Sequence, residues 1–180
     1  MEFAEVVKGR RSSRSYQDRS ASDSDIEQLI DLARYAPSSM NGQPWHFVIV
    51  RNQQTKKALA EIKNKYCPKE KQAYSADFLK NAPVVIVVCV DKARSFDREV
   101  ENALLASSYI MLGAHNLGFG SVYMSAYAEG EPNICEEIRR ELSIPAGIEP
   151  ISILPMGYPN ESAPPKELRS LKEMMHFERF

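Results

Sequence analysis

Residues 33–50, ARYAPSSMNGQPWHFVIV, contain the end of one element, a polar loop and the start of another. The apolar positions that lead up to Ala33 have helical spacing, and Pro37 ends the helix that they predict. After Pro44 the run WHFVIV is rich in β-branched and aromatic residues, which predicts a strand. A loop placed between two core elements in this way either turns the chain or holds a ligand.

The residues before this stretch predict two helices separated by a basic segment. EFAEVVK repeats its apolar residues at i, i+3 and i+4, and Gly9 ends the short helix that this spacing predicts. Ser24 and Glu27 form a capping-box pattern, which places the start of the second helix there. Residues 10–18 have no periodicity and predict an irregular segment between the two helices.

The residues after this stretch alternate between helical and strand patterns. APVVIVVCVD is apolar at consecutive positions, which predicts a strand buried on both faces. TKKALAEIKNKY, REVENALLASSYIMLGAHNLG and PNICEEIRREL predict helices, SVYMSAY and EPISILPMGYP predict strands, and residues 67–81 predict a helical or irregular segment. We therefore expect an α+β fold around one mixed sheet, formed by residues 1–180 as a single domain. The apolar tail around Met174 and Phe177 is expected to dock, either on this chain or on another subunit.

Composition excludes several classes of protein. Lys and Arg number 23 against 24 Asp and Glu, so no overall positive charge favours nucleic acid or a membrane surface. The longest apolar run is far shorter than the ~20 residues of a membrane span. Cys67, Cys89 and Cys135 are too widely spaced to indicate a metal site. We expect a cytoplasmic protein without nucleic-acid, membrane or metal partners.

The segment GRRSSR is the first candidate binding site. Arg10, Arg11 and Arg14 with Ser12 and Ser13 supply the donors that a phosphate monoester needs, although an arbitrary basic turn of this kind is often only solvated. A second basic pair, Lys166 and Arg169, would complete a clamp if the fold brought it near.

No residue pattern supplies a catalytic acid, base or nucleophile. The order around Gly118 and Gly120 is helix, glycines, strand, whereas the dinucleotide fingerprint needs strand, glycines, helix. There is no GxSxG motif, and the three histidines have no acidic partner at a recognisable spacing. An anion clamp with a shaped polar loop fits a site in which a cofactor carries the chemistry.

GRRSSR and APSSMNGQPWHF, taken together, closely resemble the FMN-dependent nitroreductase family. NAPVVIVV, LGAHNLGFGSVYM and LPMGYPNESAPPK resemble the remaining blocks of that family, so the resemblance covers essentially the whole chain. It implies a three-layer fold with a mainly antiparallel sheet and a domain-swapped C-terminal tail. It also implies a homodimer with FMN at the subunit interface and NAD(P)H as co-substrate.

The resemblance implies site residues position by position. It assigns the flavin phosphate to the two basic segments, the ribityl chain to the long helix, and the ring to the polar loop of the partner subunit and to backbone N–H groups at a strand end. Arg14 would lie near flavin N1 and O2, where a cation favours the reduced form. The cofactor-binding residues expected in this way, including the weaker candidate Gln43, are Arg10, Arg11, Ser12, Arg14, Pro37, Ser38, Ser39, Asn41, Gln43, Asn102, Met124, Ser125, Ala126, Lys166 and Arg169.

Two departures from the family pattern leave the substrate open. Many relatives have Glu-Gly or Gly-Gly where this chain has Ser125-Ala126, and polar flavin contacts of some relatives have no clear counterpart around Tyr74 and Asp77. The leading hypothesis is ping-pong hydride transfer from NAD(P)H to a nitroaromatic, quinone or similar acceptor, with no catalytic side chain required. The alternatives are a flavin dehydrogenase or dehalogenase for one metabolite, and a flavin-binding protein without catalysis.

Overall fold

The fold is built on an antiparallel sheet, seen in a computed structural model that describes residues 1–67, 75–127 and 133–180. The strand order is β1-β2-β5-β3, and β4 also pairs with β5. The strands are β1 Trp45–Val50, β2 Val84–Asp91, β3 Gly120–Ser121, β4 Met124–Ser125 and β5 Ile148–Gly157. Every named strand pair is antiparallel, and the parallel part of the expected mixed sheet is a bridge between Ser12 and Ser121. The α+β fold class is confirmed.

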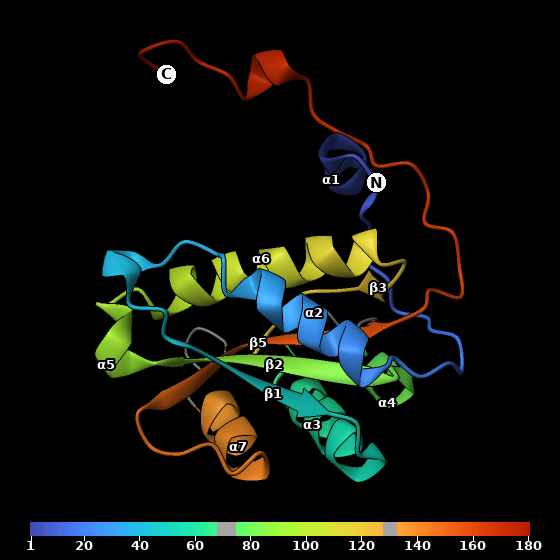
Figure 1. Cartoon of the computed structure of the whole chain (residues 1–180), viewed down its shortest axis with the longest axis vertical. Helices are drawn as coiled ribbons and strands as arrows, with labels where there is room; N and C mark the ends of the chain where they lie inside the picture. The colour runs from blue at the N-terminus through green and yellow to red at the C-terminus, as the bar shows by residue number, and fades with distance from the viewer. Residues whose placement is uncertain (68–74, 128–132) are drawn as a thin grey trace.

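Strand β2 lies at the centre and is buried on both faces, as its continuous apolar run predicts. Val84, Ile86 and Val88 point into a core shared with helices α2 and α6. Val85 and Val87 point into a second core shared with α3, α4 and α7. The alternation of side chains along one strand therefore holds the helical layers on opposite faces of the sheet (Figure 1).

The helices follow the predicted order. They are α1 Phe3–Gly9, α2 Asp23–Ala33, α3 Gln53–Lys65, α4 Phe78–Asn81, α5 Lys92–Ser95, α6 Glu99–Asn116 and α7 Asn133–Glu141, with short 3-10 turns at η1 Ser39–Asn41 and η3 Leu171–Glu173. Part of the expected irregular segment 67–81, residues 68–74, lies outside the described residues, and α4 occupies its end.

Two local predictions are wrong. Helix α2 begins two residues earlier than expected, because Ser22 rather than Ser24 is the N-cap and exchanges hydrogen bonds with Asp25. The segment SVYMSAY is not one strand but contributes to the short strands β3 and β4. Strand β3 pairs with Met156–Gly157 of β5, and β4 pairs with Ser152–Ile153. The two short strands therefore pair with different parts of β5.

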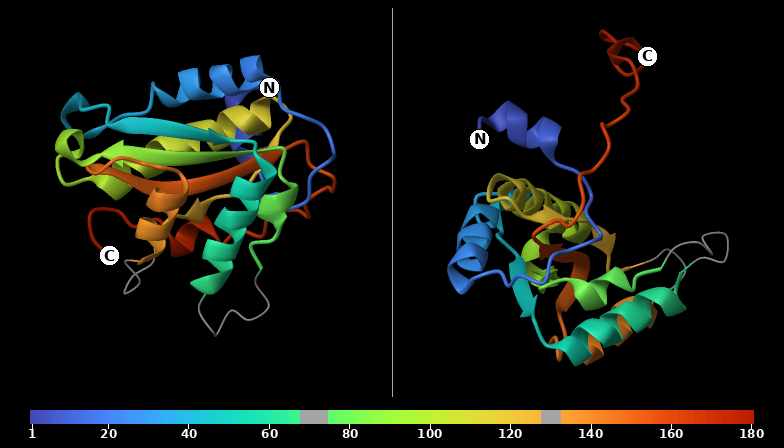
Figure 2. Two further views of the ribbon diagram at one scale, coloured as in Figure 1. Left: turned by 90° about the horizontal axis from the view of Figure 1, so that it is seen from below. Right: turned by 90° about the vertical axis from the view of Figure 1, so that its right-hand side faces the viewer.

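Helix α1 and the C-terminal tail project beyond α6, on the side of the molecule away from α3 and α7 (Figures 1 and 2). Residues 160–180 are exposed throughout, and Leu168, Leu171 and Phe177 have more than 70% of their surface in contact with solvent. Apolar side chains in such a position lack the burial that would hold the tail in place within this chain. No helix of the described residues is long and apolar enough to cross a bilayer.

Candidate functional site

The basic segment 10–14 runs from the end of α1 along the edge of the sheet at β3. The Ser13 N–H donates a 3.1 Å hydrogen bond to the Ser121 carbonyl. A Cβ on Gly120 would lie 2.6 Å from the Ser13 Cβ, so only glycine allows the two chains to come this close. The guanidinium of Arg11 donates to the Lys8 carbonyl at 2.6 Å and to the Pro164 carbonyl at 3.3 Å. Arg11 thus links the basic segment to Pro164, at the start of the C-terminal tail.

Residues 10–14 form a basic corner whose arginines have no ion-pair partner among the described residues. Among the ion pairs of the described residues none includes Arg10, Arg11 or Arg14. Burial first, and then the neighbouring Arg10 and Arg11, lower the pKa of His115 below its ordinary value. A cleft of about 700 Å³ opens here, lined among others by Arg11, Ser12 and His115. Guanidinium and hydroxyl donors beside a cleft suit a phosphate group.

The second basic pair lies on the exposed tail. Lys166 follows Pro164 closely, so the contact of Arg11 with the Pro164 carbonyl brings the start of the tail to the basic segment. Arg169 lies farther along, where its Nε donates to the carboxylate of Glu173 at 3.2 Å. Within one chain, the structure therefore brings the start of the tail to the clamp and leaves Arg169 engaged elsewhere.

The polar loop that begins at Pro37 has a strained, internally bonded backbone. Met40, Asn41 and Gln43 have φ values of 50°, 54° and 46°, in the left-handed region that residues other than glycine rarely adopt. The Ser38 hydroxyl accepts from the Gln43 N–H at 3.0 Å, and the Gln43 side-chain amide donates to Asn41 Oδ1 at 3.1 Å. Such a conformation persists only where its surroundings hold it.

Asn102 supplies part of that support, and its role as a ribityl contact stays a prediction. Its Oδ1 accepts from the Ser39 N–H at 2.9 Å and its Nδ2 donates to the Ser95 carbonyl at 3.0 Å. Only 1% of the residue is exposed. Because both ends of the amide are bonded inside the chain, the side chain presents no surface to a ligand.

The loop and the basic segment lie at opposite ends of α6 (Figure 1). Asn102, near the start of this helix, holds the loop, whereas His115, near its end, lies against Gly9 of the basic corner. At ~1.5 Å per residue these two positions are about 20 Å apart along the helix axis. The two halves of the expected site therefore do not meet within one chain.

The model of one protein family, described as the nitroreductase family, matches residues 7–158. The chain belongs to the nitroreductase family. It is 36% identical over 172 residues to a protein of Methanothermobacter thermautotrophicus provisionally named NADH dehydrogenase/NAD(P)H nitroreductase, covering 93% of this chain and 83% of the relative. It is 25% identical over 175 residues to an iodotyrosine deiodinase of Thermotoga neapolitana, covering 89% and 90%. The solved structure of an FMN-dependent nitroreductase from Clostridium difficile superposes with a TM-score of 0.83 at 30% identity, covering 98% and 99%.

The strand end at residues 124–126 supplies the backbone N–H groups that are expected near the flavin, and the sheet engages them unequally. The Ala126 N–H donates a 2.8 Å hydrogen bond to the Ile151 carbonyl, so it is not free to face a ligand. The alternation of an antiparallel ladder turns the Ser125 N–H away from β5. Of the three expected donors, Ser125 is the one that the strand leaves available.

Two residues that no sequence pattern indicates, Lys63 and Arg94, support the strand end and the polar loop. Lys63 on α3 donates to the Ser125 carbonyl at 2.7 Å, and burial lowers its pKa. Arg94 on α5 donates to the Gly42 carbonyl at 2.8 Å. Both act on backbone carbonyls, and no residue pattern indicates which carbonyl a lysine or arginine will meet. Among the described residues no group of three or more His, Cys, Asp or Glu side chains is placed to hold a metal.

Proposed function

We propose that this member of the nitroreductase family is an FMN-dependent oxidoreductase that takes electrons from NAD(P)H and passes them to nitroaromatics, quinones or similar electron-poor acceptors. The observation that carries the proposal is the placement of an unpaired basic corner and a strained polar loop at opposite ends of α6. Family membership and the FMN-dependent relative of the same fold support the cofactor. Residues 1–180 act as one FMN-binding domain, and use of NAD(P)H agrees with the expected cytoplasmic location.

The residues of the basic corner bind the phosphate of the flavin. Arg10 and Ser12 donate to it, and Lys166 approaches from the start of the tail. Arg14 lies farther along, with its guanidinium carbon 5.9 Å from the Phe78 ring centroid and without a carboxylate partner among the described residues. A fixed cation there stabilises negative charge at N1 and O2 of the flavin.

The site is completed by a second copy of the chain. Helix α6 exposes Leu105 and Tyr109, and α1 exposes Phe3 and Val7, each pair one helical turn apart on one face. Two α6 helices packed antiparallel across a two-fold axis bring the loop of one subunit to the basic corner of the other. In this homodimer Pro37, Ser38, Ser39, Asn41 and the weaker candidate Gln43 face the flavin of the partner subunit.

When bound, FMN would supply hydride transfer through N5, from NAD(P)H in one half-reaction and to the acceptor in the other, as a ping-pong reaction requires. The chain supplies position and charge: the loop lies against the ring, Arg14 stabilises charge, and the Ser125 N–H approaches from the strand end. Met124 and Ala126 keep Ser125 in the ladder. No side chain needs to form a covalent bond, since the protein only holds donor and acceptor within about 3–3.5 Å of the reacting atom.

A second candidate keeps the flavin and changes the substrate. The relative named iodotyrosine deiodinase favours a reductive dehalogenase, and a dehydrogenase for one metabolite is a further alternative. Turnover of simple nitroaromatics far below that of one halogenated or saturated metabolite would support it. A flavin-binding protein without catalysis is the third alternative, and it would retain flavin that neither NADH nor NADPH reduces.

The visible spectrum of the purified protein tests the proposal directly. We expect absorbance of bound flavin, release of FMN on denaturation, anaerobic bleaching by NADH or NADPH, and recovery of colour on adding a nitroaromatic or quinone. A colourless protein that binds no added FMN would refute it. Bleaching without recovery by any acceptor of these classes would refute the substrate class and leave the cofactor in place.

A further inference from the structure

We infer that Asn102 is a positioning residue that fixes the loop serving the flavin of the partner subunit, and so acts across the dimer. This inference rests on the proposed function, because it concerns the same interface site. It assigns Asn102 to the opposite flavin from the one implied by a ribityl contact. The distinction can be measured because each subunit contributes different parts to each of the two sites.

The contacts of Asn102 converge on one strained segment. Its carboxamide joins the Ser39 N–H to the Ser95 carbonyl, and its backbone carbonyl accepts from Trp45 Nε1 at 2.9 Å. One residue of α6 thus holds both the start of the loop and the first residue of the strand that follows it. Since the left-handed backbone of Met40, Asn41 and Gln43 is intrinsically unfavourable, these contacts fix the direction in which the loop points.

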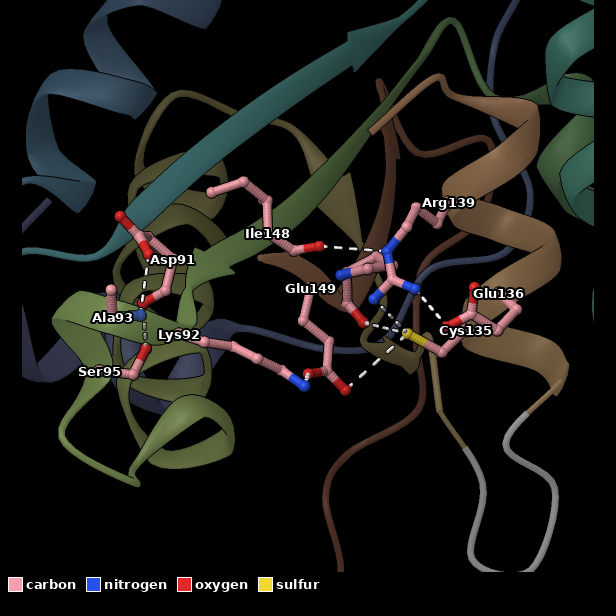
Figure 3. A network of polar contacts seen from close by, with 10 residues as sticks. Asp91, Lys92, Ala93, Ser95, Cys135, Glu136, Arg139, Ile148 and Glu149 are labelled. Atoms are coloured by element: carbon pink, nitrogen blue, oxygen red, sulfur yellow. Dashed lines mark hydrogen bonds and ion pairs between the residues drawn. The ribbon is translucent and has the colours of Figure 1, made fainter. Parts of the chain in front are cut away.

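The anchor itself is held rigidly. Ser95 belongs to α5, whose first turn is capped by Asp91 through the Ala93 N–H at 2.9 Å, and whose Ser95 hydroxyl donates to the Asp91 carbonyl at 2.7 Å (Figure 3). Lys92 pairs with Glu149 of β5 at 2.6 Å. The amide of Asn102 therefore bonds to a carbonyl on an element that is fixed to the sheet.

Position along α6 gives the direction of action. Asn102 lies at the loop end of the helix, about 20 Å from the basic corner of its own chain. Its carboxamide faces the loop and not the corner that binds phosphate. A change at Asn102 must therefore reach a flavin through the loop, and that loop completes the site of the other subunit.

The first test compares Asn102→Leu with Ser107→Ala in the homodimer. Ser107 is a matched control, because it is fully buried on the same helix and its hydroxyl has no hydrogen-bond partner among the described residues. We expect Asn102→Leu to raise the Kd for FMN about tenfold or more through loss of two buried hydrogen bonds, and Ser107→Ala to leave it unchanged. Amide hydrogen exchange in residues 38–43 of the flavin-free protein should accelerate in Asn102→Leu alone. Unchanged FMN affinity would overturn the inference.

Asn102→Asp separates loop positioning from general loss of stability. A protonated Asp can accept from Ser39 and donate to Ser95 as Asn does, whereas an ionised Asp loses the donor. FMN affinity of Asn102→Asp should therefore improve as the pH is lowered, relative to wild type at each pH. A parallel loss at every pH would contradict positioning by these two bonds.

Mixed dimers test the action across the interface. One subunit carries Arg10→Ala and the other Asn102→Leu, with different tags for purification and native mass spectrometry to verify the dimer. If Asn102 acts on the partner's flavin, both defects fall on one site and one site of wild-type affinity remains. If it acts on its own subunit's flavin, both sites are damaged and the inference fails.

Placing both substitutions on one subunit, opposite a wild-type partner, reverses the expectation. Action across the dimer then damages both sites, whereas action within the subunit leaves one intact. If Arg10→Ala proves neutral in its own homodimer, the proposed phosphate clamp is wrong, and the Asn102→Leu homodimer still tests whether Asn102 positions the loop. A monomer by mass would refute the dimer of the proposed function and this inference with it.

Discussion

The backbone of Gly42 packs directly against that of Arg94: a Cβ on Gly42 would lie 2.1 Å from the Arg94 carbonyl oxygen, while Arg94 Nε donates back to the Gly42 carbonyl. The φ of Gly42 is −67°, so glycine is required here by the close approach and not by its backbone angle. Helix α5 and the loop thus form one packed unit at the start of α6.

Gly42→Ala should displace the loop from α5. The added methyl overlaps a backbone atom that cannot rotate away, so we expect a loss of about 1–3 kcal/mol in the free energy of unfolding. If the loop serves the flavin of the partner subunit, the Kd for FMN should rise as well. Chemical denaturation and flavin titration measure the two effects, and Ala146→Gly, at an exposed turn, is the control. A wild-type free energy of unfolding together with a wild-type Kd for FMN would show that the contact between Gly42 and Arg94 has room for a methyl group.

Arg10→Ala should weaken FMN binding without altering the fold. It removes a charge-assisted contact to phosphate of order 1.5–3 kcal/mol, which corresponds to a Kd raised more than tenfold. Arg140→Ala, at an exposed position on α7, is the matched control. Fluorescence titration with FMN and with riboflavin measures the effect, and the difference in Kd between the two ligands should become smaller in the variant. An unchanged preference for FMN over riboflavin would refute the assignment of Arg10.

Much of the fold follows from patterns that the sequence displays directly. The continuous apolar run of β2 identifies the central strand, because burial on both faces leaves little room for polar residues, and the long apolar run of α6 identifies the helix that packs on it. The predicted start of α2 is wrong because Ser22 and Ser24 are each followed three residues later by an acidic residue. Only the backbone conformation decides which hydroxyl caps the helix. Short strands such as β3 have too few residues to show a period at all.

The sequence indicates candidate site residues but not how the fold arranges them. The basic segment and the loop were found from sequence, yet their separation along α6 depends on how the chain folds. Asn102 shows the limit most clearly: a polar residue on a buried helix serves a ligand or the chain itself, and the sequence does not say which. The same holds for Arg94 and Lys63, which bind carbonyls.

His115 should make the stability of the protein depend on pH. Its pKa lies below the ordinary value of 6.5, so the folded state disfavours the charged form. As the pH falls below about 6.5, the unfolded chain takes up the proton more readily, and the free energy of unfolding decreases until the folded pKa is passed. His115→Gln should flatten this part of the stability profile. A profile identical to wild type between pH 7 and pH 5 would show that His115 is not responsible.

Arg10→Ala should raise the pKa of His115, because it removes one of the two cations that lower it. Binding of FMN or inorganic phosphate at the clamp should shift it in the same direction by offsetting their charge. NMR titration of the His115 imidazole resonances measures both effects. An unmoved His115 titration in the variant would contradict the electrostatic link.

Removal of residues 166–180 separates the two roles of the tail. Leu168, Leu171 and Phe177 are exposed in one chain, and their burial on a partner would stabilise a dimer by roughly 1.5–3 kcal/mol each. We therefore expect the truncated protein to dissociate more readily and to lose FMN, as measured by light scattering and flavin content. Its matched control is the full-length Lys166→Ala/Arg169→Ala variant, which should remain dimeric while binding FMN more weakly, because it loses charge and keeps the apolar contacts. A truncated protein that stays dimeric at low concentration would refute the docking of the tail on the partner subunit.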